Sequence, residues 1–580
     1  MASLNAEMKA GRLSACAFFL FAFLAVCLFR MQILKGDYYR GLSEKNRLRL
    51  VYLEGARGKI LDRRGRTLVT SRLSFNCSAF AHESKTRITQ TIERLAPLLG
   101  EPPLDIFRRY QKRKAGIYNT VVLAEDIPSE KAMAIEEQLY QLPGVMVETH
   151  PVREYPLGEA ASCVTGFIGP QTTEEAEELE EKGYRPVDWI GREGLEKYYE
   201  SDLRGHSGGL QLEVDSRGQY VQVLGVQEPA VGRNIQVTLD AELQDFTQKQ
   251  LEGHRGALIV MELTQGGILA MNSSPSYDAN LFSSVRGRRN VGKYLTAPHS
   301  PMMNRAIQSQ VPCGSIFKIV TGLAALEARA ITPQTVFSCP GFYLSGKKMF
   351  RCWKEKGHGP QNLSDAYAHS CDVFFYLTGL SVGGDLIQRK AVQFGFAAPT
   401  GIDLPGEKKG LVPSREWKQK SLNTSWFEGD TLNLSIGQGY LEVTPIQALG
   451  MIAVVATGGL RLKPHLLEKI EGVSAPRGVR SRVEADPKFL EAVKHGLEEV
   501  IHSDSGTGRA AKIPGVRVAG KTGTAETGGK KTHAWFVGYA PADDPKVALV
   551  VFLEHGGHGG VEAAGVARAV LEKLKEKNYL

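Results

Sequence analysis

An uninterrupted apolar run near the N-terminus constrains this chain more than any other feature. Residues 13–29 read LSACAFFLFAFLAVCLF, without a charged side chain, and Arg12 and Arg30 border the run. A stretch of about 17 apolar residues is the lower limit for a helix that crosses a bilayer, and a flanking arginine can extend the span by placing its charge at the interface. We therefore expect a transmembrane anchor over residues 13–34.

The competing interpretation of this run is a secretory signal peptide that is cleaved off. Ala25-Val26-Cys27 matches the small-residue pattern of a cleavage site poorly, which favours an uncleaved anchor. Flanking charge does not settle the orientation, because basic residues also follow the run, but long domains can be translocated regardless of charge. We expect residues 1–12 to form a cytoplasmic tail, with a single pass through the cytoplasmic (inner) membrane and the remainder of the chain on the periplasmic, extracytoplasmic side.

Length and composition describe an ordinary globular chain beyond that run. At roughly 100–200 residues per domain, its length predicts about two to four domains. The chain has 580 residues, 42% of them hydrophobic and 23% charged, which excludes a mostly disordered, collagen-like or polytopic membrane protein. The net charge of +8 is spread along the chain without a basic block, so we expect no nucleic-acid partner.

The residue composition and the pattern of apolar residues change near Gly232, which predicts a division of the chain into two parts. Residues 35–234 mix turn-rich and charged segments, and residues 84–150 are rich in helix formers, which predicts a helical insertion. Between residues 235 and 580, strand patterns at both ends enclose mainly helical and loop segments, which predicts an α+β domain with a central antiparallel sheet flanked by helices. The strand patterns cover residues 235–239, 256–263, 268–272, 534–539 and 547–553, and a helical pattern covers 562–579.

A serine and a lysine open an apolar periodic segment in the second half. Ser315-Ile-Phe-Lys318 places the two side chains three residues apart, on one face of a helix, so that Lys318 can reach Ser315 Oγ. The N-terminus of a helix also favours negative charge that develops there. The pattern is weak alone, because Ser345-Gly-Lys-Lys348 fits it too.

Two further patterns follow in order. Ser370-Cys-Asp372 fits S-x-[N/D], which also occurs elsewhere in the chain, whereas Lys521-Thr522-Gly523-Thr524 occurs once, ahead of an aromatic-rich strand pattern. Gly523 would let a substrate backbone approach the edge of its strand. S-x-x-K, S-x-[N/D] and K-T-G in this order form the signature of penicillin-binding proteins and class A β-lactamases.

On these motifs the chain resembles the class B penicillin-binding proteins, which are peptidoglycan D,D-transpeptidases. The resemblance implies an elongated, mixed pedestal (dimerisation-type) domain at residues 35–234 and a β-lactamase-like transpeptidase domain at 235–580. It excludes the bifunctional class A type, because no glycosyltransferase domain fits before residue 234. It extends to Arg57-Gly58 with Asp62-Arg63 and Gly65, Arg153-Glu-Tyr-Pro156, Gly191-Arg-Glu-Gly-Leu-Glu196, Asn304-Arg-Ala306 and Ser435-Ile-Gly-Gln-Gly439.

Within this family, the stretch from Cys352 to Gly359 and the S-C-D form of the second motif are most similar to the side-wall elongation branch, penicillin-binding protein 2. The chain departs from the family at Cys313, where proline is usual, and at Ile316, where a small threonine is usual. Neither departure removes a reacting group, so we expect activity to be kept and the affinity for β-lactams to differ.

The resemblance implies a serine acyl-enzyme mechanism that needs no cofactor. Ser315 attacks the penultimate D-Ala carbonyl of a stem peptide, Lys318 accepts the serine proton, Ser370 relays a proton to the leaving amine, and Asp372 fixes the loop. β-Lactams mimic D-Ala-D-Ala and trap Ser315. In this resemblance, Lys521, Thr522 and Thr524 hold the terminal carboxylate, and Gly523 lies at the strand edge. The implied partners are peptidoglycan stem peptides, β-lactams, a SEDS-family glycosyltransferase and other elongation-complex proteins.

Three cysteines and a histidine lie close together between the first two motifs. Cys339, Cys352, His358 and Cys371 are the right donor types for a structural tetrahedral zinc ion, although their spacing is wider than in zinc fingers. In an oxidising periplasm two of these thiols could instead form a disulfide, or all three could stay unlinked. His358 lies between two glycines, so it could also be an ordinary loop histidine.

Two other functions share some of these features. A D,D-carboxypeptidase or a β-lactam-hydrolysing enzyme would carry the same motifs, but such enzymes usually lack a long N-terminal domain. A β-lactam-sensing receptor would need several membrane spans and a cytoplasmic effector, whereas this chain has one apolar run and a short N-terminal tail. The transpeptidase is therefore the favoured prediction.

Overall fold

The computed structural model describes residues 2–80, 85–113, 120–214, 220–283, 285–475, 481–529 and 531–580. These residues form two compact units. The first unit comprises residues 1–56, 73–151 and 205–231, and the second comprises 57–72, 152–204 and 232–580. The domain boundaries expected at residues 34 and 234 stay predictions.

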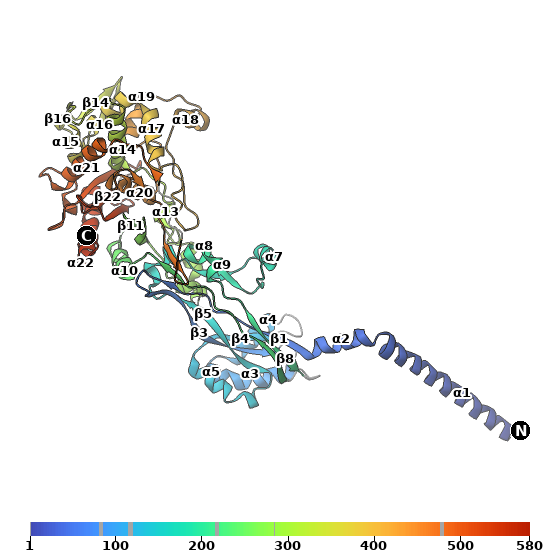
Figure 1. The fold of residues 1–580 in the computed structure, drawn as a ribbon. Coiled ribbons are helices and arrows are strands. Elements are labelled where there is room, and N and C mark those ends of the chain that lie inside the picture. The colour runs from blue at the N-terminus through green and yellow to red at the C-terminus, as the bar shows by residue number, and fades with distance from the viewer. Residues whose placement is uncertain are drawn as a thin grey trace. The chain divides into compact units, whose positions relative to one another are not determined.

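The N-terminal apolar run is helical. Helix α1 (Ala2–Phe29) continues as a π-helical turn, η1 (Arg30–Leu34), and α2 (Gly36–Arg47) follows (Figure 1). The stretch Gly11–Leu34 has 24 residues and a mean hydropathy of 2.2, and it is unburied. A fully exposed apolar helix of this length is costly in water and suits a bilayer. The structure therefore has a helix fit to anchor the chain in a membrane, as predicted.

The first unit combines strands and helices. Strands β1 (Leu48–Leu53), β8 (Gly208–Val214) and β9 (Tyr220–Gln227) form an antiparallel sheet in the order β1-β8-β9, and the end of β3 (Thr67–Phe80) pairs with β4 (Thr120–Ile127). Helices α3 (Lys85–Leu99), α4 (Pro103–Arg113) and α5 (Ser129–Glu136) share one apolar core with the end of β3 and with β4. In α4, Ile106 and Tyr110 are buried because a spacing of four places them on one face. The predicted helical insertion thus also contains strands, namely β4 and most of β5 (Val145–Glu154).

In the second unit, a small mixed sheet runs β19-β18-β10-β2 and then the start of β3. Its strands are β2 (Ile60–Leu61), β10 (Ile235–Val237), β18 (Leu467–Ile470) and β19 (Val473–Ser474). Asp62 closes the tight turn between β2 and β3, because its Oδ1 accepts hydrogen bonds from the backbone N–H groups of Arg64 and Arg66 (both 2.8 Å), and Gly65 takes a φ of +80°.

A five-stranded antiparallel sheet forms the centre of the second unit. Its order is β12-β11-β23-β22-β21, with β11 at Gly256–Glu262, β12 at Ile268–Ser274, β21 at Ala519–Ala525, β22 at His533–Ala540 and β23 at Val547–Leu553. Every residue of β22 and β23 is buried, so both faces of the sheet are covered. Helices α10 (Ala241–Gln250), α20 (Pro445–Ala456) and α22 (Ala564–Glu576) pack against it (Figure 1). The predicted α+β architecture is confirmed, and β21 lies at one edge of the sheet.

The helical part of this unit lies between β12 and β21 in the sequence. Helix α14 (Lys318–Glu327) packs against α16 (Asp372–Val382), and α16 packs against α19 (Glu428–Ser435). The pairs β13 (Phe337–Cys339) with β16 (Gly359–Gln361) and β14 (Phe342–Ser345) with β15 (Lys348–Arg351) form two small ribbons. Further helices here are α15 (Leu363–Ala368), α17 (Gly384–Gln393), α18 (Arg415–Leu422) and α21 (Pro487–His502).

Candidate active site

Ser315 lies in a short helical turn at the start of α14. The 3-10 turn η4 (Gly314–Phe317) leads directly into α14, so the side chains of Ser315 and Lys318 are one turn apart. Ser315 is half-buried, whereas Lys318 is fully buried. The competing S-x-x-K match at Ser345 lies at the tip of the β14–β15 hairpin, where Ser345 pairs with Lys348. Only the first match is attached to a buried helix.

Glycines bring this turn against strand β21. A Cβ on Gly314, which has a φ of +57°, would lie 2.5 Å from the carbonyl oxygen of Thr524, and a Cβ on Gly523 would lie 2.6 Å from that of Cys313. Gly314 N–H also donates to the carbonyl of Gly437 (2.9 Å). Side chains at these glycines would force the turn away from the strand. Glycine at position 523 is therefore needed to seat the serine turn, in addition to the substrate approach expected from the sequence.

The ammonium group of Lys318 connects the first motif to the second. Nζ donates to Asp372 Oδ1 (2.7 Å), to the carbonyl oxygen of Ser370 (2.8 Å) and to Ser370 Oγ (3.3 Å). Within the described residues, Ser315 Oγ is not among its hydrogen-bond partners. In structures without substrate, catalytic hydrogen bonds are often loose and tighten when substrate binds.

The second motif is held in a strained, well-supported conformation. Ser370 has a φ of +53°, which is uncommon for a residue with a side chain. Asp372 begins α16, where the helix N-terminus favours its negative charge, and its Oδ2 accepts a hydrogen bond from Trp353 N–H (3.0 Å). Tyr367 donates to the carbonyl of Lys318 (3.2 Å). Strain that its surroundings hold in place is frequent at functional sites.

Lys521 brings a second buried cation to the same place. Burial, and then the positive charge of Lys318, lower the pKa of Lys521 well below its ordinary value of 10.5, although Asp372 acts in the opposite direction. Its Nζ donates to the carbonyl of Thr522 (3.1 Å). The charge of one carboxylate, Asp372, thus acts on both lysines. This excess of positive charge, at the edge strand β21, suits an anionic extended peptide.

The hydroxyl groups of the third motif have partners that the motif analysis missed. Thr522 Oγ1 donates to Thr507 Oγ1 (3.2 Å), and Thr524 Oγ1 accepts from Gly559 N–H (3.4 Å). Gln438 Nε2 donates to the carbonyl of Thr524 (3.4 Å). The signal for Gln438 was its place in the Ser435–Gly439 motif, whereas Thr507 lies in a short Ser/Gly/Thr loop that carries no distinctive pattern.

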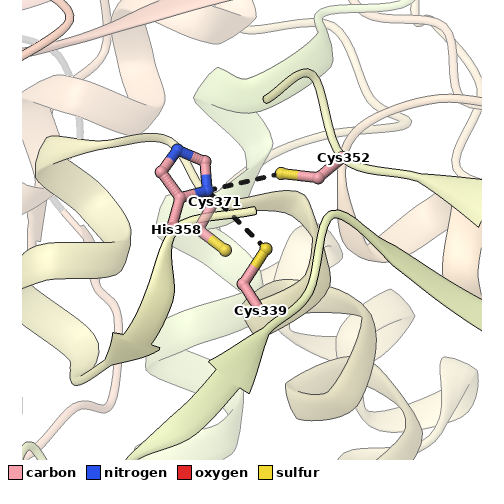
Figure 2. A group of neighbouring side chains, drawn as sticks. All are labelled: Cys339, Cys352, His358 and Cys371. Carbon is pink, nitrogen blue, oxygen red and sulfur yellow. Dashed lines mark hydrogen bonds between the residues drawn. The ribbon is translucent and has the colours of Figure 1, made fainter. Parts of the chain in front are cut away.

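The three cysteines and the histidine converge as well. Cys339 ends β13, Cys352 follows β15, His358 precedes β16, and Cys371 is the residue before α16. Their ligand atoms all lie within 4.8 Å of one another, and Figure 2 shows the four side chains pointing toward a common centre. His358 Nδ1 is 3.5 Å from Cys352 Sγ and 3.7 Å from Cys339 Sγ.

These distances fit a tetrahedral metal ion. Zn–S bonds of about 2.3 Å and Zn–N bonds of about 2.0–2.1 Å at tetrahedral angles place sulfur and nitrogen about 3.5 Å apart. All eight cysteines are free thiols in the structure. A hydrogen bond with Cys371 lowers the pKa of the Cys352 thiol, and His358 lowers it further, while the same bond raises the pKa of Cys371. The donor set therefore fits zinc.

The cluster is directly connected to the catalytic motifs. Cys371 lies between Ser370 and Asp372 in the chain, and Cys352 precedes Trp353, whose N–H binds Asp372. Trp353 Nε1 also donates to the carbonyl of His369 (3.0 Å). Any ligand that fixes these cysteines also fixes the segment that holds Lys318.

Two family models match the chain. The penicillin-binding protein transpeptidase domain matches residues 256–572, and the penicillin-binding protein dimerisation domain matches residues 52–237. The peptidoglycan D,D-transpeptidase MrdA of Haemophilus influenzae is 33% identical over 573 residues, which cover 94% of this chain and 88% of the relative.

Solved structures resemble the whole chain. The chain of penicillin-binding protein 2 in its complex with MreC from Helicobacter pylori matches with a TM-score of 0.83 and 30% identity, covering 92% of this chain and 99% of that one. A chain of a peptidoglycan synthase complex, solved to study the coordination of polymerization and crosslinking, matches with a TM-score of 0.74 and 30% identity, covering 97% of this chain and 98% of that one.

Proposed function

The chain belongs to the penicillin-binding protein family, in its penicillin-binding protein 2 (MrdA) branch, and we propose that it is a peptidoglycan D,D-transpeptidase that acts in cell elongation. One observation carries the proposal. The buried ammonium group of Lys318, one turn from Ser315, contacts Ser370 and Asp372, while the K-T-G strand packs on the same turn. This arrangement supports the proposed roles of Ser315 as nucleophile, Lys318 as base and the K-T-G strand as the carboxylate-binding element.

In the first step, Ser315 Oγ attacks the carbonyl carbon of the penultimate D-Ala. The serine proton passes to the uncharged form of Lys318, and the backbone N–H groups of Ser315 and Thr524 stabilise the negative oxygen, an effect typically worth about 3–4 kcal/mol. The C–N bond then breaks, Ser370 passes a proton to the nitrogen, and the terminal D-Ala leaves. An ester between Ser315 and the stem peptide remains.

The third motif selects the substrate. Lys521 supplies positive charge, and the hydroxyl groups of Thr522 and Thr524 supply hydrogen bonds for the terminal carboxylate of D-Ala-D-Ala. The deficit of negative charge beside Lys318 and Lys521 supports this role, because a substrate carboxylate completes the cluster.

In the second step, an amine from a neighbouring stem peptide attacks the ester, forms the cross-linking amide and releases Ser315. Water in place of the amine would give the D,D-carboxypeptidase reaction. A β-lactam enters by the first step and leaves Ser315 acylated.

We propose in addition that Cys339, Cys352, His358 and Cys371 hold a structural zinc ion. When bound, zinc would supply a cross-link between the loops that carry these residues, and no chemical step passes through it. The protein side chains would then keep Ser370 and Asp372 in place around Lys318. The free thiols and the short sulfur–nitrogen distances support zinc over a disulfide.

The membrane helix and the relatives support a location and partners. We propose that residues 35–580 lie on the periplasmic side of the inner membrane and that a SEDS-family glycosyltransferase and elongation proteins such as MreC bind this chain. Protease added to intact spheroplasts should then degrade all but the anchor, and a protected chain would contradict the orientation.

Copurification of the glycosyltransferase with this chain from detergent extracts tests the partner. A glycosyltransferase that does not copurify would contradict the proposed partner.

Intact mass spectrometry of the full chain in detergent, before and after treatment with a penicillin, tests the proposed nucleophile. We expect a lasting increase by one drug molecule that is absent in Ser315→Ala. No increase, or one that also appears in Ser315→Ala, would contradict the assignment of Ser315. An increase that decays within seconds would favour a β-lactam-hydrolysing enzyme.

A further inference from the structure

A basic cavity of about 490 Å³ lies where helix α21 ends, beside the 3-10 turn η5 (Arg509–Ala511) and helix α22. Its size is within the usual range of ligand pockets, about 300–1,000 Å³. Arg509, Lys512 and Arg568 line it, together with one carboxylate, that of Asp504. Neither the motifs nor the proposed mechanism uses this cavity.

The positive charges of the lining are only partly neutralised. Arg568 Nε is 2.9 Å from Glu572 Oε1, but this pair is exposed, and exposed ion pairs contribute little. Arg509 Nη1 donates to the backbone carbonyl of Asp504 (2.6 Å), which carries no net charge. Among the described residues, neither Arg509 nor Lys512 has an ion-pair partner. Three cations against one carboxylate leave an excess of two positive charges in the lining.

A histidine adds a neutral donor to the same cavity. His502 is the last residue of α21 and lines the cavity, and its Nε2 accepts a hydrogen bond from Val518 N–H (3.2 Å). A ring nitrogen that accepts a hydrogen bond carries no proton, so the neutral ring holds its proton on Nδ1. Nδ1 is therefore the donor that His502 has for a ligand.

The end of α21 does not oppose an anion as strongly as a free helix end would. The last carbonyl groups of a helix carry partial negative charge. At this end, the carbonyl of Glu499 accepts from Ser503 N–H (3.1 Å), and that of Val500 accepts from Gly508 N–H (2.9 Å). These acceptors are occupied, so the charged side chains dominate the cavity.

The origin of the cations favours a phosphate group over a carboxylate. Arg509 and Lys512 come from η5 and the residue after it, whereas Arg568 comes from α22. A phosphate monoester presents three oxygens in different directions and carries about −1.5 to −2 charges near neutral pH, which matches the excess of the lining. A carboxylate presents two coplanar oxygens and one charge. The planar fork of arginine also suits phosphate.

The cavity has room for more than a phosphate ion. Ala510, Ile513 and Pro514 supply an apolar wall beside the basic groups. An apolar wall gains from contact with carbon atoms, which inorganic phosphate lacks. The ligand that fills the cavity therefore has an organic part.

We propose that this cavity binds a phosphate monoester of a small organic molecule. Arg509, Lys512 and Arg568 surround the phosphate group, and Nδ1 of His502 donates to it. The apolar wall covers the organic part. The inference goes beyond the proposed function and does not depend on it, because no step of transpeptidation uses this cavity.

Isothermal titration calorimetry of the full chain in maltoside detergent tests the site with three probes: glycerol 3-phosphate, inorganic phosphate and succinate. We expect one glycerol 3-phosphate to bind per chain, several-fold more tightly than inorganic phosphate, because the wall contacts its carbon chain. Succinate carries two negative charges but no phosphate, and its Kd should be about tenfold or more higher. Tm should rise with the concentration of glycerol 3-phosphate.

Two charge reversals locate the binding. Lys512→Glu and Arg568→Glu each place a carboxylate beside the phosphate, so each should raise the Kd of glycerol 3-phosphate about tenfold or more. Both side chains are exposed, so the variants should fold. Lys488→Glu is the matched control, because Lys488 is exposed at the other end of α21, outside the lining, and the net charge changes equally. Its Kd should stay within about twofold of wild type.

The same titration in lipid nanodiscs separates a lipid headgroup from a soluble ligand. Phosphatidic acid carries a phosphate monoester, whereas phosphatidylglycerol carries a diester and controls for the negative surface. A weaker apparent affinity for glycerol 3-phosphate in phosphatidic acid than in phosphatidylglycerol supports the cavity with a lipid as its ligand. Equal affinity in both supports it with a soluble phosphate.

Several outcomes would overturn the inference. These are no binding of glycerol 3-phosphate in the millimolar range, succinate bound as tightly as glycerol 3-phosphate, or an unchanged Kd in both charge-reversal variants. The same loss of affinity in Lys488→Glu would show that the phosphate responds to net charge and not to this cavity. Acylation of Ser315 by penicillin is measured separately, so a failure of the proposed function stays distinct from a failure of this inference.

Discussion

The second unit contains two buried clusters of charged side chains that differ in their balance of cations and carboxylates. One joins Arg57 and Arg153 to Glu196 and Glu200. The other pairs Lys318 with Asp372 and places Lys521 within electrostatic range of both. The first has two cations and two carboxylates, whereas the second has two cations and one carboxylate.

In the first cluster, each charge has a partner at hydrogen-bond distance. Arg153 Nε is 2.6 Å from Glu196 Oε1, and Arg57 Nη2 is 2.8 Å from Glu196 Oε2 and 2.7 Å from Glu200 Oε2. Burial acts to raise the pKa of Glu196, but the charges of Arg153 and Arg57 and their hydrogen bonds outweigh it and leave that pKa below its ordinary value. The cluster cross-links segments around residues 57, 153 and 196, and its role is structural.

In the second cluster, Lys318 forms an ion pair with Asp372. Among the described residues, the hydrogen-bond partner of Lys521 Nζ is the backbone carbonyl of Thr522 and not a carboxylate. An uncompensated buried cation costs stability, and such costs concentrate at functional sites. The two clusters thus differ in charge balance: the first is neutral, and the second lacks the one negative charge that we propose a substrate carboxylate supplies.

Breaking the unbalanced cluster should have the largest effect. Lys318→Met removes the proposed base, and we expect the rate of acylation by penicillin to fall at least ~10⁴-fold, measured by intact mass over time. Lys390→Met is the control, because Lys390 is a buried lysine paired with Glu327 outside the site. Acylation of Lys318→Met at a rate near that of wild type would contradict the role of Lys318.

Breaking the balanced cluster should affect folding instead. Glu196→Gln leaves Arg153 and Arg57 with one fewer buried carboxylate, and we expect the free energy of unfolding to fall by roughly 3–5 kcal/mol, seen as a lower Tm. Penicillin acylation of the folded variant should stay near that of wild type. Glu200→Gln should cost less, since Glu200 is partly exposed and pairs with Arg57, whereas Glu196 pairs with both arginines. A selective loss of acylation with unchanged Tm would show that the first cluster is not structural.

Removing Lys521, the cation without a carboxylate partner among the described residues, tests the difference between the two clusters further. Lys521→Met should slow acylation yet stabilise the fold by ~1–2 kcal/mol near neutral pH, because a poorly compensated buried charge is lost. Since the folded pKa of Lys521 lies below its unfolded value of 10.5, the unfolded chain binds more protons between these two values.

The stability of wild type should therefore rise with pH across that window, and the variant should lack this rise. Tm measured as a function of pH checks both statements. A variant less stable than wild type at every pH would argue against an unfavourable charge at Lys521.

The zinc proposal predicts the smallest effect on the catalytic cluster. Native mass of the untreated chain should show one zinc ion, and Cys339→Ser should lose it, whereas Cys163→Ser should keep it. Loss of zinc should lower Tm and slow acylation several-fold, because Cys371 then holds Ser370 and Asp372 less firmly. Detection of a disulfide between two of the cluster cysteines would overturn the zinc assignment.

The sequence predicted the local parts of this fold well. Periodicity located β11, β12, β22 and β23 of the central sheet. The motifs named Lys318, Ser370 and Asp372, which the structure brings into hydrogen-bond contact. Their chemical roles stay predictions. Periodicity and motifs report neighbours along the chain and known spacings, which explains why these features were accessible.

Contacts that depend on distant segments were beyond sequence reasoning. The packing of Gly523 against Cys313, the hydrogen bond from Thr522 to Thr507 and the support of Asp372 by Trp353 each join residues whose separation carries no periodic signal. The division into two units likewise follows from chain segments that return after long intervals. Strands β4 and β5 inside the helix-rich stretch were missed because their pairing depends on β3.

The most direct test of the central claim is to follow both products when the full chain in detergent is given a D-Ala-D-Ala stem peptide and a labelled acceptor amine. We predict release of D-Ala together with a matching amount of labelled amide, both absent in Ser315→Ala. Release of D-Ala without any labelled amide would contradict transpeptidation and identify a carboxypeptidase.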